Sequence, residues 1–140
     1  MKIITAKHSG FCFGVKRSVA LARKALKEAK KPLYSLGPII HNNNVIRQLE
    51  KEGLKVISDL GNIKKGTMVI RTHGLTPKQI KEIKEKGLEV IDTTCPYVKA
   101  SQRICQSLVK QGIKPVIVGD RGHAEIQSLL GFSHGQAAVV

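Results

Sequence analysis

Six side chains that can bind metal ions, bind anions or move protons are spread along the chain. They are Cys12, His41, His73, Cys95, His123 and Glu125. Thiolates are typical ligands of zinc and of iron–sulfur clusters, and imidazoles bind transition metals or donate hydrogen bonds to phosphate oxygens. Carboxyl groups transfer protons when their surroundings tune them to do so. These residue types allow several chemistries, and which one applies depends on whether the fold brings the six together.

The order of the expected helices and strands predicts an α/β fold built from parallel-sheet βα repeats. A 16-residue stretch has apolar side chains at helical spacing, and Thr76 with Gln79 resembles a capping box. We expect helices at residues 15–30, 42–52, 77–86 and 97–111, and strands at residues 2–6, 33–36, 55–57, 67–71, 88–91 and 115–118. Residues 136–140 can begin a further strand.

Cys95-Pro96 interrupts the alternation of strands and helices after five expected strands, which suggests a domain boundary. We expect residues 1–96 to form a first α/β domain and residues 97–140 to form an incomplete second α/β domain. One certain strand and two helices bury too little apolar surface to make a core alone.

The six candidate side chains come after expected strands. Cys12 follows the first strand, His41 the second, His73 the fourth, Cys95 the fifth, and His123 the sixth, with Glu125 two residues later. Ligands of open parallel sheets bind outside the carboxyl ends of the strands, where helix N-termini favour anions. The sequence therefore predicts a metal or anion site shared by several loops.

Each candidate also has a structural interpretation. Cys12 between two phenylalanines suits an inert buried thiol, and each histidine alone suits a turn or a helix cap. Cys105 lies in the middle of an expected helix, and we predict that it is a small core residue. His8 and His134 have no motif, and we treat both as structural.

Composition limits the classes of partner. The formal net charge is +14, which attracts anions, but the lysines are scattered and aromatic residues make up only 4%. We expect a lysine-rich solvated surface and no nucleic-acid partner. No apolar run approaches the roughly 20 residues of a membrane span, and residues 1–14 lack a signal-peptide pattern. We therefore predict a cytoplasmic protein with no membrane partner.

Five motifs resemble those of the 4-hydroxy-3-methylbut-2-enyl diphosphate reductases, in the same order and with similar spacing. They are GFCFGV at residues 10–15, IHN at 40–42, RTHG at 71–74, DTTCP at 92–96 and GHAE at 122–125. The resemblance covers the chain to about residue 130. It implies a three-domain, pseudo-threefold α/β fold around a [4Fe–4S] cluster, of which this chain holds the first domain and part of the second.

The resemblance also implies a role for each candidate residue. Cys12 and Cys95 would be metal ligands of the cluster, and His41, His73 and His123 would bind the substrate diphosphate. Glu125 would be the catalytic proton donor. The implied reaction is reductive dehydroxylation to isopentenyl and dimethylallyl diphosphate, the last step of the non-mevalonate isoprenoid pathway, with electrons from a ferredoxin- or flavodoxin-type donor.

The family's third cysteine belongs to a later domain and has no match here. Cys105 is a poor substitute, and the residues after Glu125 match the family only loosely. We therefore expect an incomplete fragment that by itself holds at most a labile cluster, which counts against activity of the 140-residue chain alone.

Two other functions remain as alternatives. A basic nucleic-acid-binding domain would show steep salt dependence and no role for Cys12 or Cys95. A zinc- or thiol-dependent hydrolase using the same loops would hold zinc instead of iron. The chain contains no GxxxxGK[ST], GxGxxG or CxxC pattern, which weakens P-loop, dinucleotide-binding and zinc-ribbon interpretations.

Overall fold

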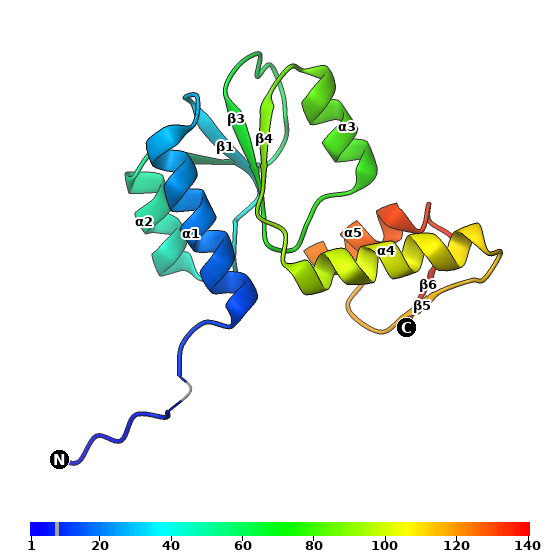
Figure 1. Cartoon of the computed structure of the whole chain (residues 1–140), viewed down its shortest axis with the longest axis horizontal. Helices are drawn as coiled ribbons and strands as arrows, with labels where there is room; N and C mark the ends of the chain where they lie inside the picture. Colours follow the sequence, from blue (N-terminus) through cyan, green and yellow to red (C-terminus); the bar gives the residue numbers. More distant parts are fainter. Residues whose placement is uncertain (8) are drawn as a thin grey trace.

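The computed structural model describes residues 1–7 and 9–140, which form five helices and six short strands (Figure 1). The helices are α1 (Phe13–Glu28), α2 (Asn43–Lys51), α3 (Pro77–Glu85), α4 (Pro96–Lys110) and α5 (Ala124–Phe132). The strands are β1 (Leu33–Leu36), β2 (Leu54–Ile57), β3 (Thr67–Ile70), β4 (Glu89–Asp92), β5 (Val116–Ile117) and β6 (Ala138–Val139).

Polar caps define where two of the helices begin. Asn42 is the N-cap of α2, and its side chain accepts a hydrogen bond from Val45 N at 3.1 Å. Thr76 and Gln79 form the capping box predicted for α3, with Pro77 at the first helical position. Such caps satisfy backbone N–H groups that have no partner within the helix. Helix starts in this chain are therefore encoded locally.

β1 to β4 form one parallel sheet in the order β2-β1-β3-β4. Because side chains alternate along a strand, Val69 of β3 packs on the face covered by α1 and α2, while Met68 and Ile70 pack on the face covered by α3. The parallel α/β class predicted from the sequence is confirmed. All four strands end at the same edge, which is where the candidate loops begin.

The strand predicted at residues 2–6 is wrong. These residues have no strand assignment, and Ile3 and Ile4 are 77% and 80% exposed. They lead away from the body of the molecule (Figure 1). A high β propensity makes a strand only where a neighbouring strand accepts its hydrogen bonds, and none of the strands in the described ranges pairs with this segment.

The C-terminal part has its own small core. β5 and β6 form a two-stranded parallel sheet, and α4 and α5 pack beside each other next to it (Figure 1). Cys105, 8% exposed, packs in this core with Ile117, Ile126 and Leu129, and burial raises the pKa of its thiol. Its predicted role as a core residue is confirmed, as is a strand within residues 136–140. The domain boundary at Pro96 stays a prediction.

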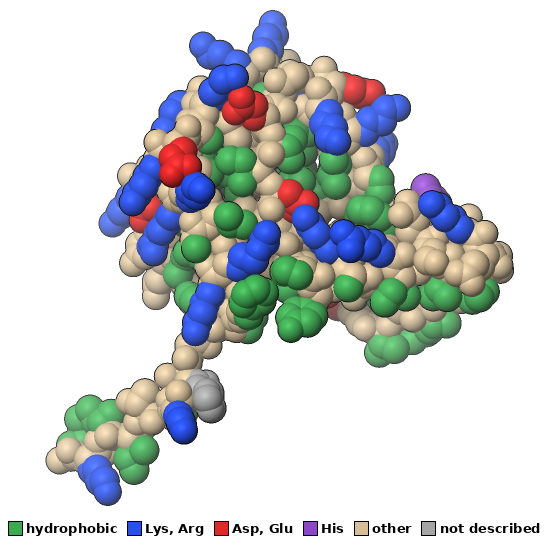
Figure 2. Space-filling model, in the orientation of Figure 1, with side chains coloured by type: hydrophobic (Ala, Val, Ile, Leu, Met, Phe, Trp, Pro, Cys, Tyr) green, Lys and Arg blue, Asp and Glu red, His purple; other side chains and the backbone are tan. Residues whose placement is uncertain are grey.

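Lysine and arginine side chains are spread over the face seen in Figure 2 instead of forming one tract. Figure 2 shows apolar side chains gathered along the lower edge of the C-terminal part. Ile104 of α4 and Val116 of β5 are 59% and 64% exposed. Within residues 1–7 and 9–140, no helix has both the length and the apolar character needed to cross a bilayer.

Candidate functional site

The structure brings the three predicted histidines together. The ring centroids of His41 and His73 are 4.3 Å apart, and His123 lies 5.3 Å from the first and 5.4 Å from the second. One ring nitrogen from each lies within 4.8 Å of the other two. We call these three residues the histidine cluster. Its geometry suits a single small ligand bound by three imidazoles.

Three different loops supply the histidine cluster. His41 follows β1 and His73 follows β3 in the four-stranded sheet, whereas His123 follows β5 in the two-stranded sheet. Thr72 N donates to Ile39 O at 3.1 Å, which ties the first two loops together. Ile39 is fully buried in the core, and this burial holds the loop that carries the exposed His41.

His73 is neutral at physiological pH. It is 9% exposed, and burial, together with the charges of His41, Arg71 and His123, lowers its pKa to about 4 from 6.5. A neutral imidazole has one N–H donor and one acceptor nitrogen. His73 can therefore donate a hydrogen bond without adding charge to the site.

His123 is held in one tautomer by a local hydrogen bond. It is the N-cap of α5, and its Nδ1 accepts from Glu125 N at 3.3 Å. An accepting Nδ1 carries no proton, so in the neutral ring the proton is on Nε2. His123 is thereby prepared as a hydrogen-bond donor, while Glu125 lies half-buried in the first turn of the same helix.

Arg71 is a site residue that the sequence did not single out. Its Nε donates to Gly74 O at 3.3 Å, and its Nη1 lies 2.7 Å from where a Cβ on Gly37 would be. It thus spans the loops of His41 and His73. Burial lowers the pKa of its guanidinium, which nevertheless remains protonated at neutral pH. The signal in the sequence was its place directly after β3, beside Thr72 and His73.

These features favour an anion over a metal ion in the histidine cluster. Arg71 supplies positive charge, His123 presents N–H, and α2 and α5 begin directly after His41 and His123. Helix N-termini carry partial positive charge and free N–H groups. Together these groups would repel a cation and bind a phosphate.

Cys12 and Cys95, which we call the thiol site, lie at two other helix N-termini. Each is an N-cap residue, Cys12 of α1 and Cys95 of α4, and neither side chain makes a capping hydrogen bond. Both thiols are free, and neither helix has an acidic residue in its first turn. A helix N-terminus stabilises a thiolate, the form that binds metals.

The thiol site fits part of an iron–sulfur centre. A Cβ on Gly14 would lie 2.6 Å from Cys95 Sγ, so the first turn of α1 closely approaches the second thiol. Thr72, whose O accepts from Cys95 N at 2.9 Å, has a buried Oγ1 without a partner within the described ranges. Two thiols are too few for a cubane cluster, and Cys105 is packed in a core. A cubane cluster at the thiol site would therefore need at least one further ligand besides Cys12 and Cys95.

The strand-end argument holds for five of the six candidates. His41, His73, Cys95 and His123 each follow a parallel strand, and Glu125 follows with His123. The placement of Cys12 after a strand is wrong, because residues 2–6 form none; its position instead comes from the start of α1. His134 is exposed, with a φ of 51°, and His8 lies outside the described residues.

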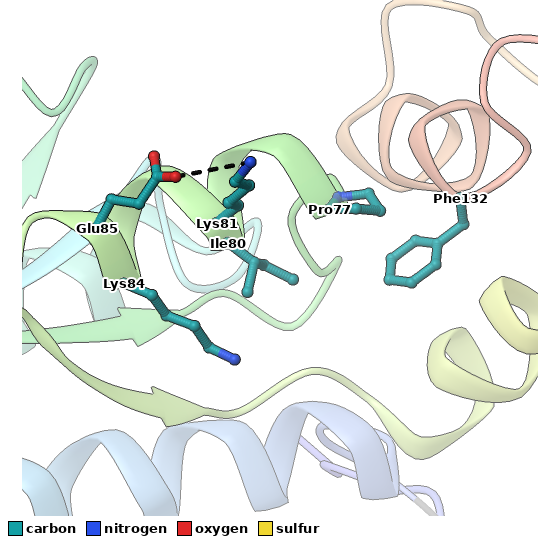
Figure 3. Close-up of a pocket in the computed structure, with 6 residues that line it drawn as sticks. All are labelled: Pro77, Ile80, Lys81, Lys84, Glu85 and Phe132. Atoms are coloured by element: carbon teal, nitrogen blue, oxygen red, sulfur yellow. Dashed lines mark ion pairs between the residues drawn. The ribbon is translucent and has the colours of Figure 1, made fainter.

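A separate hollow of about 610 Å³ lies between α3 and α5 (Figure 3). Ile80 of α3 and Phe132 of α5 both point into it, and Lys81 and Glu85 form an ion pair of 3.7 Å on its rim. None of its lining residues belongs to the histidine cluster or the thiol site. The hollow is therefore not the predicted site.

The fold and the two sites define an α/β protein that gathers imidazole and thiol side chains from several loops. The chain belongs to the LytB family, since the family model described as "LytB protein" matches residues 3–140. This match extends to the last residue, so the expectation that the resemblance ends near residue 130 is wrong.

Two curated proteins that are similar over the whole of this chain have the same name. The chain is 46% identical to the 4-hydroxy-3-methylbut-2-enyl diphosphate reductase of Geobacter metallireducens over all of its 140 residues, which is 49% of that protein. It is 42% identical to the reductase of the same name from Alkaliphilus oremlandii, again over its whole length and 50% of the relative. The chain thus spans about half the length of these curated relatives.

Solved structures agree in fold. A structure of (E)-4-hydroxy-3-methyl-but-2-enyl diphosphate reductase, the terminal enzyme of the non-mevalonate pathway, superposes with a TM-score of 0.84 at 44% identity over 99% of this chain and 50% of its own. The E-1-hydroxy-2-methyl-but-2-enyl-4-diphosphate reductase from Plasmodium falciparum superposes with a TM-score of 0.90 at 30% identity, over 96% of this chain and 42% of its own.

Proposed function

We propose that this chain is part of a 4-hydroxy-3-methylbut-2-enyl diphosphate reductase and carries its diphosphate-binding histidines and two of its cluster ligands. The observation that carries the proposal is the histidine cluster, in which three imidazoles from three loops lie within 5.4 Å of one another. The names of the relatives support it. Together they support a diphosphate as the anion.

In this proposal the histidine cluster binds and orients the diphosphate. His123 donates through Nε2, because its Nδ1 is already used as an acceptor. His73 donates as a neutral imidazole, and Arg71 offsets the negative charge of the phosphates. Because α2 and α5 begin beside these side chains, their N-termini add to the attraction. Holding the diphosphate in this way would fix where the rest of the substrate points.

Cys12 and Cys95 would hold two iron atoms of a [4Fe–4S] cluster, with further ligands from outside this chain. When bound, the cluster supplies electrons and an open iron that acts as a Lewis acid on the hydroxyl group. Both cysteines lie at helix N-termini with free side chains, so their sulfur atoms are available as ligands.

The overall reaction would be R–OH plus two electrons and two protons giving R–H plus water. One proton leaves with the hydroxyl oxygen as water, and the other is added to carbon to give isopentenyl or dimethylallyl diphosphate. Glu125 is the carboxyl group two residues after His123, half-buried in the first turn of α5. We assign it the role of the proton donor.

We further propose a ferredoxin- or flavodoxin-type protein as the electron donor. The net charge of +14 suits an acidic partner. The three-domain, pseudo-threefold arrangement, the domain boundary at Pro96 and the cytoplasmic location also remain proposals for the whole protein.

The test is to purify the protein as its source cells make it, under argon, and to measure its metal content, visible spectrum and turnover of 4-hydroxy-3-methylbut-2-enyl diphosphate with a low-potential reductant. We expect iron and sulfide, a brown colour and both products. Zinc without iron would instead support the hydrolase alternative. Binding to DNA or RNA that weakens steeply with salt, with no turnover, would support the nucleic-acid alternative.

A further inference from the structure

A buried hydrogen-bond chain links α4 and α5 to the loop after β3 that carries His73. Gln102 Nε2 donates to Ser128 Oγ at 2.7 Å, and Ser128 Oγ donates to Leu75 O at 3.2 Å. Gln102 is 6%, Ser128 1% and Leu75 1% exposed. Hydrogen bonds this deeply buried are directional and strongly favour one arrangement of the segments they join.

Each of the three segments that these hydrogen bonds link begins at or near a residue of the proposed sites. Leu75 lies two residues after His73, Ser128 lies on α5, which is capped by His123, and Gln102 lies on α4, which is capped by Cys95. The hydrogen bonds therefore connect the three segments at their buried sides, away from the ligand. Of the three cluster histidines, His123 alone comes from the second sheet, so its distance from His73 depends on this connection.

Close packing around these hydrogen bonds also restricts how the loop after β3 can move relative to α5. Gly74 has a φ of +77°, and a Cβ there would lie 3.0 Å from Ser128 Oγ and 3.3 Å from Thr94 Cγ2. Gly131 of α5 approaches Thr76 so closely that a Cβ would lie 2.7 Å from Thr76 Cβ. The backbone beside His73 thus rests directly on the buried hydroxyl of Ser128.

We infer that Gln102 and Ser128 are positioning residues that hold His73 and His123 at the separation needed to share one diphosphate. This inference rests on the proposed function, because it assigns the diphosphate to the histidine cluster. Neither residue touches the ligand in this arrangement; both act through the loop of His73 and the helix of His123. Apolar side chains would fill the same space without fixing the direction of approach.

The experiment compares Ser128→Ala and Gln102→Met with a matched control, Ser18→Ala, in the protein as its source cells make it. Ser18 is equally buried, and its Oγ shares a 2.6 Å hydrogen bond with Thr93 Oγ1, but it joins α1 to the loop after β4 and does not reach His123. Methionine matches glutamine in length and keeps the packing. The readouts are thermal unfolding, the Kd for inorganic pyrophosphate, and the ring titration of His73 by NMR.

We expect Ser128→Ala and Gln102→Met each to weaken pyrophosphate binding roughly tenfold, since small misplacements of binding groups have large effects. The pKa of His73 should rise from about 4 towards 6.5 as its loop loosens. Ser18→Ala should lower the melting temperature to a similar degree and leave both other readouts unchanged.

Unchanged pyrophosphate affinity and an unchanged His73 titration in both variants would overturn the inference and leave the proposed function standing. Equal losses in Ser18→Ala would also overturn it, because the effect would then follow from stability alone. If the wild-type protein does not bind pyrophosphate but His73 still titrates higher in Ser128→Ala and Gln102→Met alone, the proposed diphosphate site is wrong and the positioning role is retained.

Discussion

The thiol site and the histidine cluster use helix N-termini in different ways. Cys12 and Cys95 are themselves N-caps with free side chains, and the cluster proposed there would need at least one further ligand. The histidine cluster is assembled within this chain from both sheets, and a buried hydrogen-bond chain supports it. The difference teaches that this chain arranges three imidazoles by its own packing, whereas its two N-cap thiols would form only part of the proposed metal site.

Replacing the thiols should have the largest effect and should separate the two sites. We expect Cys12→Ser and Cys95→Ser each to abolish the visible spectrum of the cluster, because serine does not replace a thiolate at iron. Pyrophosphate affinity at the histidine cluster should fall much less, because neither cysteine belongs to that cluster. The control is Cys105→Ser, which should keep the cluster, and its loss there would refute the ligand assignment.

Glu125→Gln should separate proton transfer from binding. The amide cannot donate an acidic proton, so turnover should fall by about 10²- to 10⁴-fold. The backbone N–H of residue 125 would still donate to His123 Nδ1 and hold that ring in place, so pyrophosphate affinity should be retained. Turnover and Kd measured on the same sample check this, and an unchanged turnover would remove Glu125 from the mechanism.

Gly14→Ala should damage the thiol site alone. The new Cβ would lie 2.6 Å from Cys95 Sγ, so the thiol or α1 must move, at a cost of about 1–3 kcal/mol. We predict less iron per chain and unchanged pyrophosphate binding. Iron analysis gives the iron content per chain, and calorimetry gives the Kd for pyrophosphate. Ala20→Gly, at an exposed position of the same helix, is the control for helix propensity. Equal loss at both sites would mean that they are coupled.

The smallest effect should be a dependence of stability on pH that comes from the histidine cluster. The pKa of His73 is lowered to about 4 in the folded protein, against 6.5 for an unperturbed histidine. Between these values the unfolded chain binds more protons, so stability is complete above pH 6.5 and falls as the pH drops towards 4. We expect the free energy of unfolding, measured with denaturant, to depend less steeply on pH in this window for His73→Gln than for the wild type. An identical dependence on pH would contradict the cause given for the pKa shift.

Much of the fold could be predicted because its signals are local. The Thr76 capping box, the Asn42 cap and the alternation of short apolar strands with helices require only neighbouring residues. The prediction failed at residues 2–6, whose composition suits a strand but which have no neighbour among the described strands. Strand formation depends on such a partner, and that information is not local.

The candidate site divides in the same way. The spacing of the cysteines and histidines after strands predicted one shared edge. His41 and His73 do lie at one edge of the four-stranded sheet, but His123 meets them from the two-stranded sheet. Arg71 was passed over, although it lies beside His73, because an arginine after a strand is common. Gln102 and Ser128 looked like ordinary helix residues, and 26 positions separate them.

By itself, the sequence determined which groups are available and the order in which the strands present them, because helix caps, strand patterns and motifs are properties of short segments. The tertiary structure alone decided that His123 approaches His73 from another sheet, that burial keeps His73 neutral, and that a glutamine and a serine hold the two together. Distance, burial and hydrogen-bond direction between remote segments arise only when the chain packs.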